Sequence, residues 1–315
     1  MIPPSPRKSL PCRRCGTCCR LGGPVLHTED LQLAARFDVG IRELAQGPAQ
    51  TVTAAAIAEL NRNGKGFGLA DLLTLRRGEL ARDDVAGTLL PLDAECVKIA
   101  PSLLPATGPT DWTCRFLGFE DDIRSDHGSR PGKTVHLATC RIHDHRPAQC
   151  RALSCTDTRA ISLQYRKERV TRADLLAAAD APASWREVPA AHEANCSVAR
   201  MAELARHIPS RNLRGKQPDA GTAPESCDSN LPGSIDETDA TNEILHILRF
   251  DASVRRLCTE RGHIPPAFLP FLLGRPATAL LEGFGLRLVR RDEKLCLVRI
   301  GPGYYPSRGA FPDRN

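Results

Sequence analysis

Four cysteines fall within eight positions near the start of the chain, in the stretch CRRCGTCC. They are Cys12, Cys15, Cys18 and Cys19. A C-x2-C pair allows two sulfurs to reach one metal ion, and the glycine after it allows the backbone to bend tightly. On a helix, Cys18 would point about 100° away from Cys19, so these two sulfurs would diverge. The segment therefore predicts either ligands for two metals or a non-helical metal knuckle.

The cysteine count of the whole chain also favours metal ligands. The chain holds 13 cysteines in 315 residues, a high and odd number. Its first residues contain no apolar stretch of signal-peptide length, and no run of about 18 apolar residues occurs in it. We therefore expect a cytoplasmic protein that does not span a membrane. Because disulfides are rare in the reducing cytosol, dense cysteines there indicate metal ligands or redox groups.

A second group of cysteines lies in the middle of the chain. Cys114 follows Trp112, and the stretch CRIHDHRPAQCRALSC contains three more cysteines. Thiolates are soft ligands that suit zinc ions and iron–sulfur clusters. Eight cysteines match two four-thiolate sites, or one cluster and one zinc. We therefore predict a metal centre formed by Cys12, Cys15, Cys18, Cys19, Cys114, Cys140, Cys150 and Cys155.

These motifs resemble the CxxCxxCC cysteine-cluster family, also called YkgJ-like, whose members are described as zinc- or iron-chelating proteins. The family pattern is C-x-x-C-G-x-C-C, then a cysteine before an apolar pair, then C-x-I-Y-x-x-R-P-x-x-C-R. The chain matches between about residues 10 and 160 and departs at His143, where the family more often has Tyr. The resemblance implies metal binding rather than one settled activity. Because a flagellin lysine N-methylase is similar to this family, it also admits an iron–sulfur-dependent methylase.

Histidines supply weaker candidates for metal ligands. His143 and His145 lie in the second cysteine group, where exposed loop histidines are the commoner outcome. His192 and Cys196 are four residues apart, a spacing that suits chelation. We nevertheless expect a solvated pair there, because both residues lie away from the apolar face of the expected helix.

Periodicity and turn residues predict a mostly helical α+β fold that is irregular and organised around the metal. Helices are expected from Thr28 to about Phe37, over 41–46, 53–64 and 187–207, after a capping box at Thr171 and Asp174, and in pieces over 242–281. Strands are expected over 72–79 and 88–99, and a β-hairpin over 285–300.

The stretch 211–239 is rich in Pro, Gly, Ser and Asp and almost lacks apolar residues, which is typical of a flexible linker. We therefore divide the chain into a cysteine-cluster domain (1–210), a linker (211–240) and a small C-terminal module of helices and a β-hairpin (241–315). The module contains two isolated cysteines, so we expect all the metal to stay with the first domain.

Three functions remain open at this point. The first is a metal-binding module that acts on an unidentified protein partner or substrate. The second is the methylase-like enzyme that the resemblance admits. The third is nucleic-acid binding through zinc knuckles, which a net charge of only +6 and an aromatic content of 4% disfavour. The stretch GKGFG lacks the features of a phosphate-binding loop, so no nucleotide site is predicted.

Overall fold

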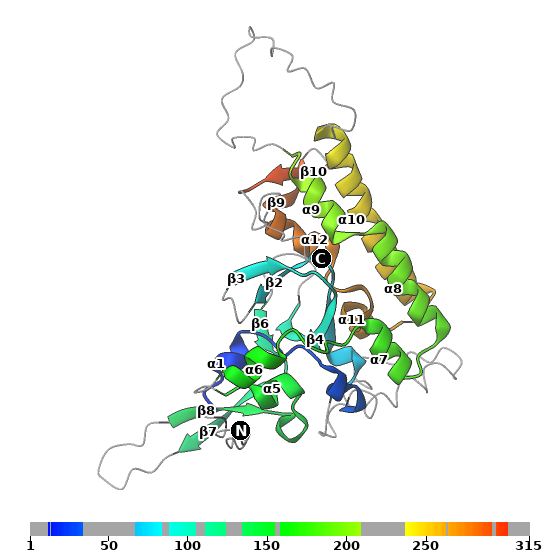
Figure 1. Ribbon diagram of the computed structural model, residues 1–315. Helices are drawn as coiled ribbons and strands as arrows, with labels where there is room; N and C mark the ends of the chain where they lie inside the picture. The colour runs from blue at the N-terminus through cyan, green and yellow to red at the C-terminus, as the bar shows by residue number, and fades with distance from the viewer. Residues whose placement is uncertain are drawn as a thin grey trace, which may run out of the picture.

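The structure, a computed structural model, describes residues 12, 14–33, 67–83, 88–104, 111–123, 134–154, 158–208, 237–262, 264–291 and 294–301. Helices and small antiparallel sheets are mixed in these residues, which confirms the α+β class. In Figure 1, the segments that carry most of the predicted metal ligands lie at the lower end of the molecule. The longer helices run along one side and upward from the middle.

The strands of the described residues pair into antiparallel ribbons of two. These are β1 (Leu72–Leu75) with β4 (Cys96–Ile99), β2 (Leu80–Asp83) with β3 (Thr88–Pro91), β5 (Pro101–Leu103) with β6 (Asp111–Cys114), β7 (Leu117–Ile123) with β8 (Thr134–Cys140), and β9 (Leu286–Arg291) with β10 (Lys294–Arg299). The predicted strand 72–79 is shorter than expected because a turn closes it, in which the Glu79 N–H donates to the Arg76 carbonyl at 3.0 Å. The predicted strand 88–99 is two strands, β3 and β4.

The helices are short except for α8 and α10. They are α1 (Thr17–Arg20), α5 (Ala148–Ala152), α6 (Arg159–Gln164), α7 (Arg172–Ala178), α8 (Ala183–Asn195), α9 (Val198–Ala205), α10 (Glu237–Glu260), α11 (Leu269–Leu273) and α12 (Ala277–Leu280). Five 3-10 turns in the described residues connect them: η1 (Thr28–Asp30), η2 (Leu69–Asp71), η3 (His143–His145), η4 (Pro266–Phe268) and η5 (Leu281–Phe284).

Local sequence signals explain where several helices begin. The predicted capping box is confirmed at α7, where the Asp174 N–H donates to Thr171 Oγ1 at 3.3 Å and the Thr171 N–H donates to the Asp174 carboxylate at 2.8 Å. The predicted helix 187–207 is in fact two helices. The first, α8, begins at Ala183 directly after Pro182, and the second, α9, begins after Ser197, whose side chain accepts the Arg200 N–H.

The C-terminal elements agree with their predictions. Helices α10, α11 and α12 are the expected pieces of 242–281, and β9 and β10 form the expected hairpin. The helix expected from Thr28 starts as η1 and is described only to residue 33. The helices expected over 41–46 and 53–64 lie outside the described residues, as does the linker up to residue 236. Residues 237–239 of the predicted linker belong to α10.

The main hydrophobic core joins residues from both sides of the predicted linker. Leu26, Val97 and Trp185 belong to the same buried cluster as Phe268 and Leu272. The rings of Trp185 and Phe268 meet edge to face, with centroids 5.2 Å apart. The boundaries at 210 and 240 stay a prediction, but the residues before and after them share one core.

None of the described helices combines the length and the apolar composition that a membrane span requires.

We predict that a protease cut between residues 211 and 236 will not separate the two fragments. The stretch has few apolar residues, so cleavage is expected there, but the shared core should hold the fragments together. Size-exclusion chromatography of the nicked protein should give one peak, and denaturing electrophoresis should give two bands. Leu272→Ala, which should cost about 2–5 kcal/mol of core packing, should favour separation. Separate peaks for the nicked wild-type protein would contradict the prediction.

Candidate metal centre

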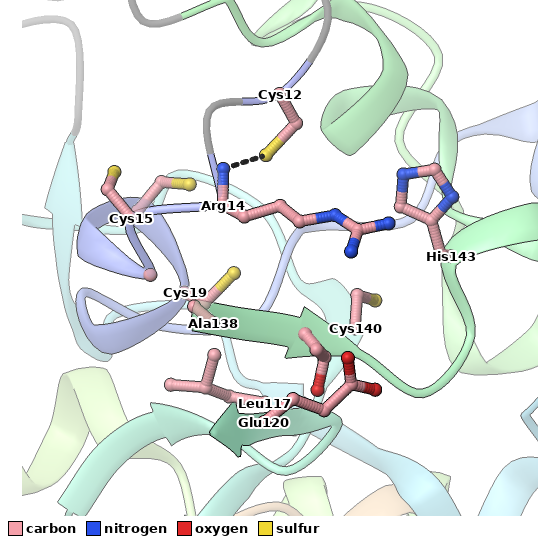
Figure 2. A pocket seen from close by; sticks show the side chains of 12 residues that line it. Cys12, Arg14, Cys15, Cys19, Leu117, Glu120, Ala138, Cys140 and His143 are labelled. Atoms are coloured by element: carbon pink, nitrogen blue, oxygen red, sulfur yellow. Dashed lines mark hydrogen bonds between the residues drawn. The ribbon is translucent and has the colours of Figure 1, made fainter. Parts of the chain in front are cut away.

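Seven of the eight predicted metal-binding cysteines lie in the described residues, and Cys155 lies outside them. The seven come from α1 and the turn before it, from the ends of β6 and β8, and from α5, which all lie in the lower part of Figure 1. Five of them line one pocket: Cys12, Cys15, Cys18, Cys19 and Cys140. In Figure 2, Cys12 and Cys15 lie on one side of this pocket and Cys140 on the other.

The two other cysteines lie behind the pocket. Cys114 is buried at the end of β6 in the main core, against which Cys19 and Cys140 also pack. Burial raises the pKa of the Cys150 thiol, and the charges of Cys114 and Cys140 raise it further. A bound cation would reverse this shift, because a coordinating thiol loses its proton outright.

Backbone N–H groups two residues further along the chain donate hydrogen bonds to several of these sulfurs. The Arg14 N–H donates to Cys12 Sγ at 3.4 Å. The Thr17 hydroxyl, followed by the Thr17 N–H, lowers the pKa of Cys15. Burial raises the pKa of Cys114 and of Cys140, and the N–H groups of Phe116 and Ile142, respectively, oppose this shift. Hydrogen bonds to sulfur stabilise the thiolate, which is the form that binds metal.

Two residues of the turn that carries Cys12 and Cys15 have positive φ angles. Arg14 has φ 53° and Gly16 has φ 74°, both in the left-handed region. Glycine adopts this conformation without strain, and a side chain at position 16 would also press on Ala138, with its Cβ only 3.0 Å away. The Ala138 N–H donates to the Arg14 carbonyl at 3.0 Å, which ties the turn to β8. The turn is therefore a knuckle held in place by its neighbouring strand.

Buried polar contacts position the helix α5 that carries Cys150. The buried carboxylate of Asp30 accepts the Ala148 N–H at 2.9 Å, at the first residue of α5. The side chain of Gln149 accepts the Val25 N–H at 2.5 Å. Burial raises the pKa of Asp30, although the N–H groups of His27 and Ala148, which both donate to its carboxylate, oppose the shift. Val25 and Asp30, which follow the first cysteine group in the chain, thus hold α5, the helix that carries Cys150.

The chemistry of this donor set fits a thiophilic metal. Soft thiolates in close groups suit zinc and iron, with metal–sulfur bonds of about 2.3 Å for zinc. Within the part of the chain that the structure describes, however, no three of these sulfurs lie within 4.8 Å of one another. Side-chain rotation would have to draw them together around an ion.

A hydrogen bond that Cys19 donates to Cys18 lowers the pKa of Cys18 to about 6 and raises that of Cys19.

Three charged or titratable side chains besides the cysteines line the pocket: Arg14, Glu120 and His143. Figure 2 shows the Arg14 guanidinium extending toward His143. His143 is partly exposed, as expected of a loop histidine, but it faces the cysteines; His145 is not among the residues that line the pocket. The sequence analysis missed Glu120 and Asp30, because nothing local distinguishes them from other surface acids. Only their contacts across the fold reveal them.

The expectation of a solvated pair at His192 and Cys196 is wrong. Both are buried, at 1% and 0% exposure, and they lie with Asp251 in a group whose ligand atoms are within 4.8 Å of one another. His192 Nε2 lies 2.8 Å from Asp251 Oδ1, an acceptor, so Nε2 carries the proton. The sequence could not place Asp251 here, because it is 59 residues from His192.

The hydrogen bonds of this buried group link neighbouring helices, and the group does not have the character of a metal site. Both oxygens of Asp251 accept hydrogen bonds from Arg255 Nε at 3.0 Å, and one accepts the Ala277 N–H at 3.0 Å. Burial, opposed by the bond to Asp251, lowers the pKa of His192, and the charges of Arg76 and Arg255 lower it further. The same two arginines would repel a cation placed here.

Comparisons with known proteins leave the family open. No family model, no curated protein and no solved structure matches this chain. The resemblance to the YkgJ-like family therefore stays a prediction.

We predict that His192 makes the protein less stable in acid. Its pKa is lowered in the folded state, so the unfolded chain binds a proton first. The contribution of neutral His192 to the free energy of unfolding is fully present above the usual histidine pKa of about 6.5. It is lost as the pH falls through the pKa that His192 has in the folded protein. Denaturant unfolding at several pH values should show a free energy that falls in acid. His192→Gln, which can still donate to Asp251, should flatten this slope, whereas His145→Gln should not. Equal slopes in all three proteins would refute the assignment.

Proposed function

We propose that this chain is a metal-binding protein whose cysteine cluster chelates zinc or iron, the iron as ions or as an iron–sulfur cluster. The observation that carries the proposal is the convergence of six cysteines, from three segments of the chain, on one pocket and the core beside it: five line the pocket, and Cys114 lies in the core against which Cys19 and Cys140 pack. Thiolate donors suit both metals, so the proposal names both.

The contrast with the other cysteines supports this proposal. Cys96 and Cys258 are also free and buried, but each is a single small side chain in an apolar cluster. Five of the predicted ligands instead line one pocket, and Cys12 and Cys15 accept backbone N–H bonds that favour the thiolate. Packing alone gives no reason for so many thiols in one place, whereas a metal does.

Positive charge surrounds the thiols. The charges of Arg146 and Arg141 lower the pKa of Cys140, against the larger effect of burial. Four thiolates around one divalent ion leave a net negative charge, which neighbouring guanidinium groups offset. When bound, the metal would supply cross-links between segments that are distant in the sequence. We accordingly expect a mainly structural metal and an interaction with a protein partner or substrate in the cytoplasm.

The other two functions considered above stay predictions. The methylase-like activity rests on the resemblance alone. Nucleic-acid binding rests on the basic residues near the cysteines, and a steep salt dependence of binding would be its signature.

Protein purified without oxygen should contain bound zinc or iron. Binding to a site that forms only in the folded chain contributes to folding free energy, so the metal should survive gel filtration. Elemental analysis measures it directly, and visible absorbance would distinguish thiolate-bound iron from colourless zinc. Folded protein with neither element would overturn the proposed function.

Cys15→Ser and Cys150→Ser should each lower the metal content, because each removes a ligand. Cys258→Ser is the matched control for a buried thiol elsewhere in the core: it should lower the melting temperature slightly and leave the metal content unchanged. Cys227 lies in the predicted linker, which is not expected to pack, so Cys227→Ser should change neither. The metal content per folded protein is measured for each variant. An equal loss of metal in all four variants would count against our assignment of the ligands.

A further inference from the structure

Helix α5, which carries Cys150, takes its N-terminal cap from a distant part of the chain. The residue at its own cap position is Pro147, whose side chain makes no capping hydrogen bond. One carboxylate oxygen of Asp30, 118 residues earlier, accepts the Ala148 N–H at 2.9 Å instead. Ala148 and Asp30 are both buried, so water does not serve this N–H. The start of α5 therefore depends on Asp30 for its acceptor.

The same carboxylate also holds the segment in which Asp30 lies. Its other oxygen accepts the His27 N–H at 3.0 Å, in a buried contact. Two N–H groups from distant parts of the chain thus share one carboxylate, which fixes the start of α5 against the segment 25–30. Removal of the carboxylate would leave two buried donors without an acceptor.

Two further contacts join the same segments on either side of Cys150. The side-chain oxygen of Gln149 accepts the Val25 N–H at 2.5 Å, and Gln149 is buried. On the other side of Cys150, Arg151 Nη2 lies 3.2 Å from Glu29 Oε2, in an ion pair that is about half exposed. Both chain neighbours of Cys150 are therefore fixed to the segment that follows the first cysteine group.

We propose that Asp30 is a positioning residue of the metal centre, whose carboxylate holds Cys150 where this thiol can share an ion with thiols of the first cysteine group. This inference rests on the proposed function and adds the residue that sets the geometry and the metal affinity of that same site. Asp30 acts through α5 rather than as a ligand, because N–H groups occupy both of its oxygens.

Preorganisation of Cys150 gives the expected effect on affinity. A ligand that is held in place before the ion arrives loses little freedom on binding. Replacement of groups that orient the ligands without touching the metal typically weakens metal affinity about 10–100-fold. We expect Asp30→Ala to weaken zinc binding by a factor in this range, because α5 loses its link to the segment 25–30.

The capping box of α7 supplies a matched control. There the Asp174 carboxylate accepts the Thr171 N–H at 2.8 Å, at the start of a short helix that holds no cysteine. Asp174→Ala should lower the melting temperature and leave the zinc affinity unchanged. A purely structural role of Asp30 would likewise move only the melting temperature, so the zinc affinity distinguishes positioning from stability.

The experiment uses the full chain, purified without oxygen, and zinc alone as the probe. Competition with a chromogenic chelator gives the zinc affinity, at a temperature well below the melting temperature of each variant. Iodoacetamide labelling and mass spectrometry then show which thiols the bound zinc protects. Cys150 should be protected in the zinc-loaded wild-type protein and labelled in zinc-loaded Asp30→Ala, whereas Cys15 should be protected in both.

Two milder variants keep the inference testable if Asp30→Ala does not fold. Asp30→Asn keeps one acceptor oxygen and should bind zinc with intermediate affinity. Gln149→Met removes the acceptor of the Val25 N–H and should also weaken zinc binding. Wild-type zinc affinity in the folded Asp30 variants would overturn the inference and leave the proposed function standing. Folded wild-type protein that binds no metal would overturn both.

Discussion

The guanidinium of Arg172, only 4% exposed, reaches three segments that lie far apart in the sequence. It donates to Glu95 before β4 at 3.0 Å, to Glu193 on α8 at 3.0 Å, and to the Leu272 carbonyl on α11 at 2.7 Å. A buried charge is tolerated only when it is paired, and loss of one partner costs about 3–5 kcal/mol. Arg172 therefore joins the segment before β4 and helix α8 to helix α11, which follows the predicted linker.

The cysteine centre lies at the edge of that body rather than inside it. Its ligands are tied to the core by a few specific contacts: the Ala148 N–H on Asp30, the Arg14 carbonyl on β8, and the packing of Cys114. Each contact fixes one cysteine-bearing segment against another. These contacts consequently bring the cysteine-bearing segments together through the backbone and the core, without any contribution from the thiols of the pocket.

Local signals in the sequence were sufficient for features that depend on neighbours in the chain. The capping box at Thr171 and the hairpin of β9 and β10 involve only short separations, and both are found where they were expected. The partners of Asp30 and Arg172 are 118 and 77 residues away, so no periodicity or propensity reports them. The burial of His192 was missed for the same reason, since its partner lies on α10.

Two-stranded ribbons are only marginally stable by themselves in water. The ribbon of β7 and β8 extends away from the core, and Phe119 on it is about half exposed, at 51%. The cation–π contact of Arg20 with Phe119 adds about 0.5–1 kcal/mol at such an exposed site. The ribbon begins three residues after Cys114 and ends at Cys140. Its base packs against the main core through Cys114, Phe116 and Cys140, whereas Phe119 lies beyond that contact. The contact of Phe119 with Arg20 therefore connects the outer part of the ribbon to α1, the helix that carries Cys18 and Cys19.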